Sequence, residues 1–173
     1  YWGFSAGLDF ETKIIFKPEA PDLLEKEFLK PSYRPRTIML SGYTDCYQPL
    51  ERKYQLTRKL LKVFLKYQHP VGIITKNALV TRDVDIIKDL ATSNLVHVIF
   101  SITSLDEKLR QKLEPRTASA AKKLRAIEEL VNHGIPVGIM NAPIIPGLNH
   151  HDSREILKRS AAAVASSAGY TVV

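Results

Sequence analysis

The 173-residue sequence contains a single cysteine, Cys46. One cysteine cannot form a disulfide within the chain, and it cannot alone supply a thiolate-ligated zinc or iron–sulfur site, which needs three or four ligands. Long apolar runs are missing too: no stretch approaches the roughly 18 consecutive apolar residues of a membrane span, and no signal segment stands at the front. The sequence therefore predicts a cytoplasmic protein with no membrane partner, whose own cysteines hold no cluster.

The composition is that of a globular protein, with 45% hydrophobic residues. The sequence starts at Tyr1 and ends at Val173 within the apolar stretch "GYTVV". We therefore expect a fragment that forms one domain over residues 1–173. The formal net charge of +7 suits a polyanion partner such as DNA, because basic side chains that neutralise phosphates release counterions. Acidic residues are interspersed with most basic ones, so a mixed solvated surface is the simpler interpretation.

Short β-branched runs alternate with amphipathic segments along the whole sequence. Nearly uniform apolar strands in strict alternation with helices predict an α/β fold whose parallel sheet is covered by helices. The chain is too short for a complete eight-fold barrel of ~250 residues, so we expect a partial barrel, truncated at both ends. The candidate strands are "KIIF" (13–16), "TIML" (37–40), "VGIIT" (71–75), "VHVIFSI" (96–102), "PVGIM" (136–140) and "YTVV" (170–173).

Apolar residues recur at helical spacing in four segments between these strands, and each segment predicts a helix with one buried stripe. Ser104 and Glu107 have the spacing of a capping box, and Asp152 stands where an N-cap is expected. Gly134 and Gly169 follow two of the predicted helices as C-cap residues. The four helical segments are 54–65, 84–91, 124–131 and 156–164.

Polar residues stand just after several predicted strands, where the loops of a parallel fold gather and make a site. Lys76 directly follows "VGIIT". Its amine could bind a carboxylate or a phosphate, form a Schiff base if burial lowers its pKa, or simply face water. Thr44 and Asp45 follow the second strand. They could contact an amine and a carboxylate, or form an Asx or ST turn that only organises the loop.

Other polar residues leave their roles open. Ser101 lies in an apolar strand, where a local hydrogen bond is the simpler account of its hydroxyl. Glu114 and Arg116 flank a proline, so they could pair with each other or cap helix ends, or Arg116 could bind a carboxylate through two hydrogen bonds. The histidines at 133, 150 and 151 lack a third ligand at a familiar spacing, so we expect no metal site from them.

Several segments in order resemble the radical S-adenosylmethionine (SAM) proteins of the branch related to spore photoproduct lyase, often labelled DNA repair photolyases. The resemblance covers nearly the whole chain, and "TDCYQPLER" followed by "ITKNALVTRD" is its most specific part. The other segments are "GFSAGLDFETKIIFKPEAPDLLEKEF", "FSITSLDEKLRQKLEPRT" and "GIPVGIMNAPIIPGLN".

The resemblance implies a partial (β/α)6 TIM-like barrel of the radical SAM type. It also implies a [4Fe–4S] cluster on a three-cysteine loop and reductive cleavage of SAM to a 5′-deoxyadenosyl radical. Family members carry a CxxxCxxC motif shortly before "GFSAGLDFETKI", and this sequence begins after that point. We therefore expect cluster ligands outside this chain and an inactive fragment. The resemblance further implies an electron-donating reductant such as flavodoxin or ferredoxin, and it allows a DNA substrate.

Position by position, the resemblance makes Thr44 the hydroxyl that meets the amino-acid end of SAM. Lys76 is similar to the lysine that pairs with the carboxylate of SAM, and Ser101 to the serine near the ribose. Asp45 aligns with an acid of the site, and the backbone near Ile145 aligns with the wall that binds adenine. These assignments suit the charges of SAM, whose methionine end offers an ammonium and a carboxylate.

The substrate is less constrained. In spore photoproduct lyase, a cysteine three residues before the aspartate returns a hydrogen atom to the product radical, and Gly42 stands there in this sequence. We therefore do not expect repair by that route. Cys46 is expected to be a bystander, because neighbouring Asp45 raises the pKa of its thiol. Two alternatives stay open: a barrel-fold, aldolase-like Schiff-base enzyme using Lys76, and a non-enzymatic nucleic-acid-binding module.

Overall fold

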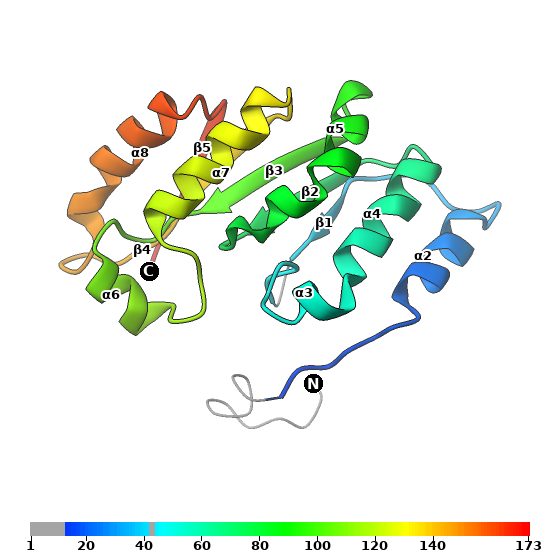
Figure 1. Cartoon of the computed structure of the whole chain (residues 1–173), viewed down its shortest axis with the longest axis horizontal. Coiled ribbons are helices and arrows are strands. Elements are labelled where there is room, and N and C mark those ends of the chain that lie inside the picture. Colours follow the sequence, from blue (N-terminus) through cyan, green and yellow to red (C-terminus); the bar gives the residue numbers. More distant parts are fainter. Residues whose placement is uncertain (1–12, 42–43) are drawn as a thin grey trace.

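The computed structural model describes residues 13–41 and 44–173. Five parallel strands form one sheet in the order β1-β2-β3-β4-β5 (Figure 1). A doubly wound sheet reverses its strand order at a switch point, whereas here every strand pairs with its neighbour in sequence, as in a barrel. The strands are β1 Ile38–Leu40, β2 Val71–Thr75, β3 Val96–Ser101, β4 Val137–Ile144 and β5 Ser167–Val172.

The helices α4, α5, α7 and α8 lie side by side over one face of this sheet (Figure 1). The helical elements are α2 Ala20–Phe28, α3 Glu51–Tyr54, α4 Leu56–Lys66, η1 Ala78–Asp83, α5 Val84–Thr92, α6 Glu107–Leu113, α7 Ala120–Asn132, η2 His150–Asp152 and α8 Ser153–Ala162. None of the helices in the described part of the chain is long and apolar enough to cross a membrane.

The two faces of the sheet are buried to different extents. Side chains that point toward the helices form the core, for example Ile73, Val98 and Phe100, which are each fully buried. On the other face Met39 is 45% exposed, and Gly72 lies beside it in the register. A Cβ atom at Gly72 would lie 2.1 Å from the sulfur of Met39, so glycine permits this close packing. In a barrel, the face away from the helices lines the interior.

The predicted strand at 13–16 is wrong, because this segment is coil. It runs toward α2 with no neighbouring strand in the described part of the chain to complete its backbone hydrogen bonds (Figure 1). Ile14 and Ile15 are 43% and 47% exposed, and the Phe16 ring packs 4.3 Å from the ring of Tyr54. The other five predicted strands are present, with β5 starting at Ser167.

The end of α8 also differs from the prediction. The helix stops at Ala162, and Val164 has a φ of +63° and is 63% exposed, so the buried stripe ends at Ser160. Gly169 lies inside β5 and is not a helix cap. Gly134 does follow α7 with a φ of +75°, the left-handed conformation expected of a residue after a helix.

The predicted capping box before α6 is wrong. Asp106 is the N-cap, and its carboxylate accepts hydrogen bonds from the amides of Lys108 and Leu109. The Ser104 hydroxyl instead donates to Asp152 at 2.5 Å. Asp152 stands at the N-cap position of α8 but makes no side-chain cap bond, because its carboxylate is used by the loop after β3.

Candidate functional site

Asp45 joins the loop after β1 to the end of β2. One carboxylate oxygen accepts from the Tyr47 amide at 2.8 Å and the Thr75 hydroxyl at 2.8 Å. The other accepts from the Lys76 amide at 2.6 Å. Asp45 therefore organises its loop, which was one of the two predicted roles. Thr44 is exposed at the same edge, and Gly42 lies outside the described residues.

Lys76 and Glu114 form an ion pair at the carboxyl ends of β2 and β3. The Lys76 side chain is 33% exposed and the Glu114 side chain 9%. The Thr103 hydroxyl lies 2.7 Å from Oε1 of Glu114, the same oxygen that faces Lys76. The second oxygen, Oε2, is buried without a hydrogen-bond partner among the described residues. Buried carboxylate oxygens are costly without a donor, so this site has one acceptor to offer a ligand.

A buried lysine lies behind this pair. Lys123 on α7 is 1% exposed, and its ammonium donates to the carbonyl of Ser101 at 2.8 Å. Burial lowers the pKa of Lys123 to about 8, while the nearby Glu114 carboxylate opposes that shift. We call Lys76, Thr103, Glu114 and Lys123 the strand-end cluster. Lys76 follows β2, Thr103 follows β3, Glu114 caps the end of α6 and Lys123 lies on α7.

The Ser101 hydroxyl does not make the local hydrogen bond that was expected, but bonds across to the neighbouring strand β4. Its side chain is buried, and the hydroxyl donates to the carbonyl of Ala142 at 3.2 Å. The Thr103 hydroxyl lies 3.0 Å from the same carbonyl. These contacts hold the end of β3 against β4, directly beside the strand-end cluster.

Ile145 is held in place by Asn149, whose side chain is 1% exposed. The Ile145 amide donates to Oδ1 of Asn149 at 2.6 Å. The Asn149 amide group donates to the carbonyls of Thr103 at 2.8 Å and Pro143 at 2.9 Å. One buried side chain thus fixes the loop after β4 against the loop after β3, which sets Ile145 near the site edge.

A second group of charges lies between α3, α4 and η1. The fully buried Asp83 accepts hydrogen bonds from the Tyr47 hydroxyl at 3.1 Å, from Arg58 at 2.9 Å and from Arg82 at 2.6 Å. Arg82 also bonds the carboxylate of Glu51 at 2.9 Å. We call these five residues the framework network. Four of them belong to the segments "TDCYQPLER" and "ITKNALVTRD", so those segments contribute scaffolding as well as site residues.

Cys46 is a poor nucleophile in this environment. Its Sγ lies 4.0 Å from the carbonyl of Leu40. Burial raises the pKa of the Cys46 thiol far above its ordinary value, and the Asp45 carboxylate raises it further. The predicted effect of Asp45 is confirmed, although burial is the larger cause.

The histidines make local contacts. His133 Nδ1 lies 2.8 Å from the Glu129 carbonyl, and His150 Nδ1 lies 3.0 Å from the Gly147 amide. Within residues 13–41 and 44–173, no group of three or more His, Cys, Asp or Glu side chains could hold a metal ion.

The sequence indicated Lys76 and Glu114 separately but missed that they pair, because 38 residues separate them. It also missed Lys123 and Asn149. A signal for Lys123 was present, since it shares helical spacing with Ile127 and Leu130 on the buried stripe of α7. A charged residue in such a stripe must find a partner. For Asn149, a loop residue, the sequence carries no comparable signal.

Chemically, the strand-end cluster can bind a zwitterion. The partly exposed ammonium of Lys76 suits a ligand carboxylate. The free oxygen of Glu114 suits a ligand ammonium once the side chain turns toward it. When a zwitterion binds, the ion pair between Lys76 and Glu114 is replaced by two contacts to the ligand. Every charge stays paired, which limits the free-energy cost of desolvation.

Comparison with protein families gives a match to the radical SAM superfamily over residues 10–159. An uncharacterized protein of Mycobacterium tuberculosis is 31% identical over 99% of this chain and 51% of its own length. One from Methanocaldococcus jannaschii is 31% identical over 78% of this chain and 49% of its own length. A Pseudomonas phage M6 protein named radical SAM Nalpha-GlyT isomerase is 26% identical over 70% of this chain and 25% of its own length. The chain spans about half the length of the uncharacterized relatives.

Two solved structures share the fold. A variant of spore photoproduct lyase with dinucleoside spore photoproduct superposes with a TM-score of 0.65 at 17% identity, over 84% of this chain and 42% of the lyase. Streptococcus suis SuiB bound to S-adenosylmethionine gives a TM-score of 0.55 at 14% identity, over 79% of this chain and 29% of SuiB. At these identities, the likeness establishes a shared partial barrel.

Proposed function

Because the chain belongs to the radical SAM superfamily, we propose that its strand-end cluster binds the methionine end of SAM. Lys76 faces the carboxylate of SAM, and Glu114 accepts a hydrogen bond from its ammonium. The buried, unpartnered Oε2 of Glu114 beside the accessible Lys76 is the observation that carries this assignment. SAM presents both charges on one carbon atom, so two adjacent side chains of opposite sign fit it.

The neighbouring residues complete the proposed pocket. Thr44 is exposed at the same edge and is proposed to reach the amino-acid end of SAM. Ser101 lies near the ribose, and the backbone at Ile145 forms the adenine wall. Asp45 positions Lys76 by accepting from its backbone amide at 2.6 Å. Its role is thus to hold the lysine still, which preserves the geometry on which binding depends.

The [4Fe–4S] cluster of the family would be held by cysteines outside this chain, and when bound it would supply the electron for reductive cleavage of SAM. Cys46 alone does not make a cluster site, because such a site needs several thiolate ligands and this chain has one cysteine. An electron donor such as flavodoxin or ferredoxin is the proposed partner. What this chain contributes is the orientation of SAM and substrate.

For the substrate, we propose a lesion in DNA. The shared fold with a lyase that holds a dinucleoside lesion supports this choice, as does the net charge of +7. A Schiff-base enzyme is less well supported, because such a lysine must lose its proton, whereas Lys76 pairs with a carboxylate. A purely nucleic-acid-binding module leaves the strand-end cluster without a role.

Isothermal titration of SAM into Lys76→Ala tests the proposal directly. In the natural full-length protein, loss of the ammonium should weaken SAM binding about thirtyfold, the value of a ~2 kcal/mol charged hydrogen bond. Lys62→Ala is the matched control, because Lys62 is an exposed lysine on α4, outside the site. Unchanged SAM affinity in Lys76→Ala would reject the assignment.

A second measurement tests the reaction class. After reconstitution with iron and sulfide and reduction, the natural protein should release 5′-deoxyadenosine from SAM. Failure to form a cluster and to release 5′-deoxyadenosine would rule out radical chemistry. Borohydride trapping of a carbonyl substrate on Lys76 would instead establish the Schiff-base alternative.

A further inference from the structure

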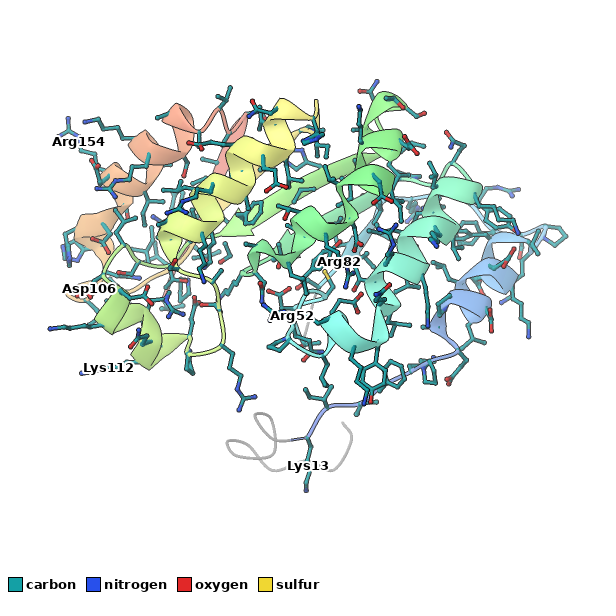
Figure 2. All side chains as sticks on the ribbon, viewed as in Figure 1. Lys13, Arg52, Arg82, Asp106, Lys112 and Arg154 are labelled. Atoms are coloured by element: carbon teal, nitrogen blue, oxygen red, sulfur yellow. The ribbon has the colours of Figure 1, made fainter. Side chains whose placement is uncertain are left out.

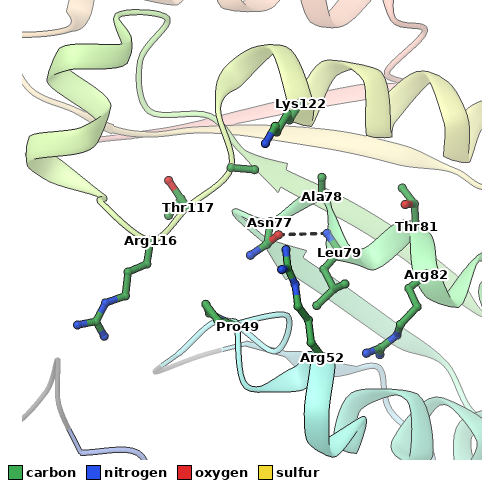
Figure 3. Close-up of a pocket in the computed structure, with 11 residues that line it drawn as sticks. Pro49, Arg52, Asn77, Ala78, Leu79, Thr81, Arg82, Arg116, Thr117 and Lys122 are labelled. Carbon is green, nitrogen blue, oxygen red and sulfur yellow. Dashed lines mark hydrogen bonds between the residues drawn. The ribbon is translucent and has the colours of Figure 1, made fainter.

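A basic cavity opens at the outer rim of the strand ends (Figure 3). It has a volume of about 540 Å³ and lies between α3, η1 and the start of α7. Among the described residues that line it, none is acidic and four are basic: Arg52, Arg82, Arg116 and Lys122. A wall with these basic side chains favours an anion as its ligand.

An adjoining cavity of about 560 Å³ shares Thr117, Ala118 and Lys122 with the first and adds Arg159. The one acidic residue among its described lining residues, Glu107, is already bound by Arg110 at 2.6 Å. We call the two cavities together the basic groove. It passes from α3 around the first turn of α7 toward α8.

The cations of the basic groove are not equally available. Arg82 is held by Asp83 and Glu51, and Arg159 pairs with Glu155 at 2.8 Å. Arg52 and Lys122 are exposed, and neither side chain has a hydrogen bond or ion pair to any residue that the structure describes. Figure 3 shows Arg52 extending from α3 toward the loop after β2, with Lys122 on the opposite wall.

The groove also offers backbone donors. No acidic residue lies in the first turn of α7, so no carboxylate offsets the positive end of its helix dipole. The small side chains of Ala118, Ala120 and Ala121 line this part of the groove. Small side chains permit close approach to the amides of the first helical turn, which bind phosphate oxygens readily.

We propose that the basic groove binds the sugar-phosphate backbone of DNA. This inference rests on the proposed function, because the groove adjoins the strand-end cluster. The Ala118 amide donates to the carbonyl of Lys76 at 3.0 Å, so the groove wall and the proposed SAM site share a loop contact. None of the described residues that line the two cavities is aromatic, so this wall offers bases no stacking partner and its contacts are to phosphates.

Fluorescence anisotropy of a labelled single-stranded DNA tests this binding in the natural protein without SAM. Arg52→Glu with Lys122→Glu should raise the Kd at least about tenfold and make the salt slope shallower by ~1.4, since each lost phosphate contact removes ~0.7. The matched control is Lys62→Glu with Arg154→Glu, which changes the net charge equally. Arg154 lies on the outer side of α8, and neither control residue lines the groove (Figure 2).

Equal losses of affinity in the groove and control pairs would overturn the proposal, because they would show diffuse charge attraction. A small phosphate ligand is the other outcome that contradicts it. In that case inorganic phosphate, titrated at constant ionic strength, would bind in an Arg52-dependent way while DNA affinity stayed unchanged in the groove variant. Binding of SAM by the groove variant, measured alongside, should equal that of the unmodified protein. DNA binding and SAM binding are tested with different variants. Failure of the DNA proposal can therefore be distinguished from failure of Lys76→Ala to weaken SAM binding.

Discussion

The framework network and the strand-end cluster are both groups of buried charges, yet they are satisfied to different degrees. Asp83 in the framework network accepts hydrogen bonds on both carboxylate oxygens from two arginines and a tyrosine. Glu114 in the strand-end cluster leaves Oε2 without a partner among the residues that the structure describes. A fully paired charge holds a fold in one conformation, whereas an incompletely paired one keeps capacity for a ligand. This difference distinguishes scaffold from site.

The largest effect is expected from Asp83→Asn. Loss of this charge leaves Arg58 and Arg82 without their shared partner, so the free energy of unfolding should fall by about 3 kcal/mol. Urea denaturation measures the change. The control is Asp85→Asn, which removes a carboxylate that is 59% exposed and should cost less than about 1 kcal/mol. Equal losses of unfolding free energy for the two variants would show that the framework network stabilises the fold no more than an exposed charge does.

The buried Lys123 predicts a pH dependence of stability. Its pKa is lowered to about 8 in the folded chain, against 10.5 for an unperturbed lysine. Between these values the unfolded chain binds more protons, so stability should rise with pH from about 8 to 10.5, by on the order of 2 kcal/mol. Below pH 8 the folded chain carries the full penalty of a buried ammonium.

Urea midpoints between pH 7 and 10 check this dependence. Lys123→Met removes the titrating group while keeping a long side chain, so its stability should change less over that range. The variant should also be more stable than the unmodified chain at pH 7. If the stability of the two proteins changed equally with pH, Lys123 would not be the source of the pH dependence.

Glu114→Gln should separate stability from binding. Lys76 is 33% exposed and can turn to water, so the free energy of unfolding should change by less than about 1 kcal/mol. SAM affinity should fall about tenfold, or ~1.4 kcal/mol, because the amide cannot accept from the ammonium as a charged oxygen does. Calorimetry and denaturation on the same preparation measure both. Glu107→Gln, which alters an exposed carboxylate of α6, should leave SAM affinity unchanged.

The smallest effects come from the loop after β1. Thr44→Ala removes an exposed hydroxyl and should weaken SAM binding about fivefold, or ~1 kcal/mol. Cys46→Ala should leave SAM affinity unchanged, because the thiol faces the carbonyl of Leu40 in β1 and packs against the core. The reverse pattern in SAM titrations would move the function of this loop to the thiol.

The sequence predicted the parallel order of the sheet because apolar strands that alternate with amphipathic helices have few other arrangements. The strands at 71–75 and 96–102 match β2 and β3 almost residue for residue. The segment 13–16 has the same composition but no neighbour to pair with, and composition carries no information about neighbours. Whether such a segment becomes a strand therefore depends on its tertiary context.

The candidate site was predictable in its location but not in its pairing. Lys76 and Ser101 were indicated by their places at strand ends, which are local properties of the sequence. Glu114, the partner of Lys76, and Arg58, one partner of Asp83, lie tens of residues away, and one sequence does not show which charges meet. Asp45 illustrates the difference. Its Asx turn is a local feature and was predictable, whereas its hydrogen bond to the Lys76 amide joins two separate segments and was not.

The strand order has a consequence for local unfolding. Among the described residues, β1 and β5 each pair along one edge only, whereas β2, β3 and β4 have a strand on both sides. Amide protection should therefore be greatest in the centre of the sheet and decline toward either edge. Lys76 follows the central strand β2, and Ser101 is the last residue of the central strand β3. Thr44 follows the three-residue edge strand β1. The proposed pocket thus combines a rigid base under the lysine and serine with a more readily opened edge at the threonine, where a ligand can enter.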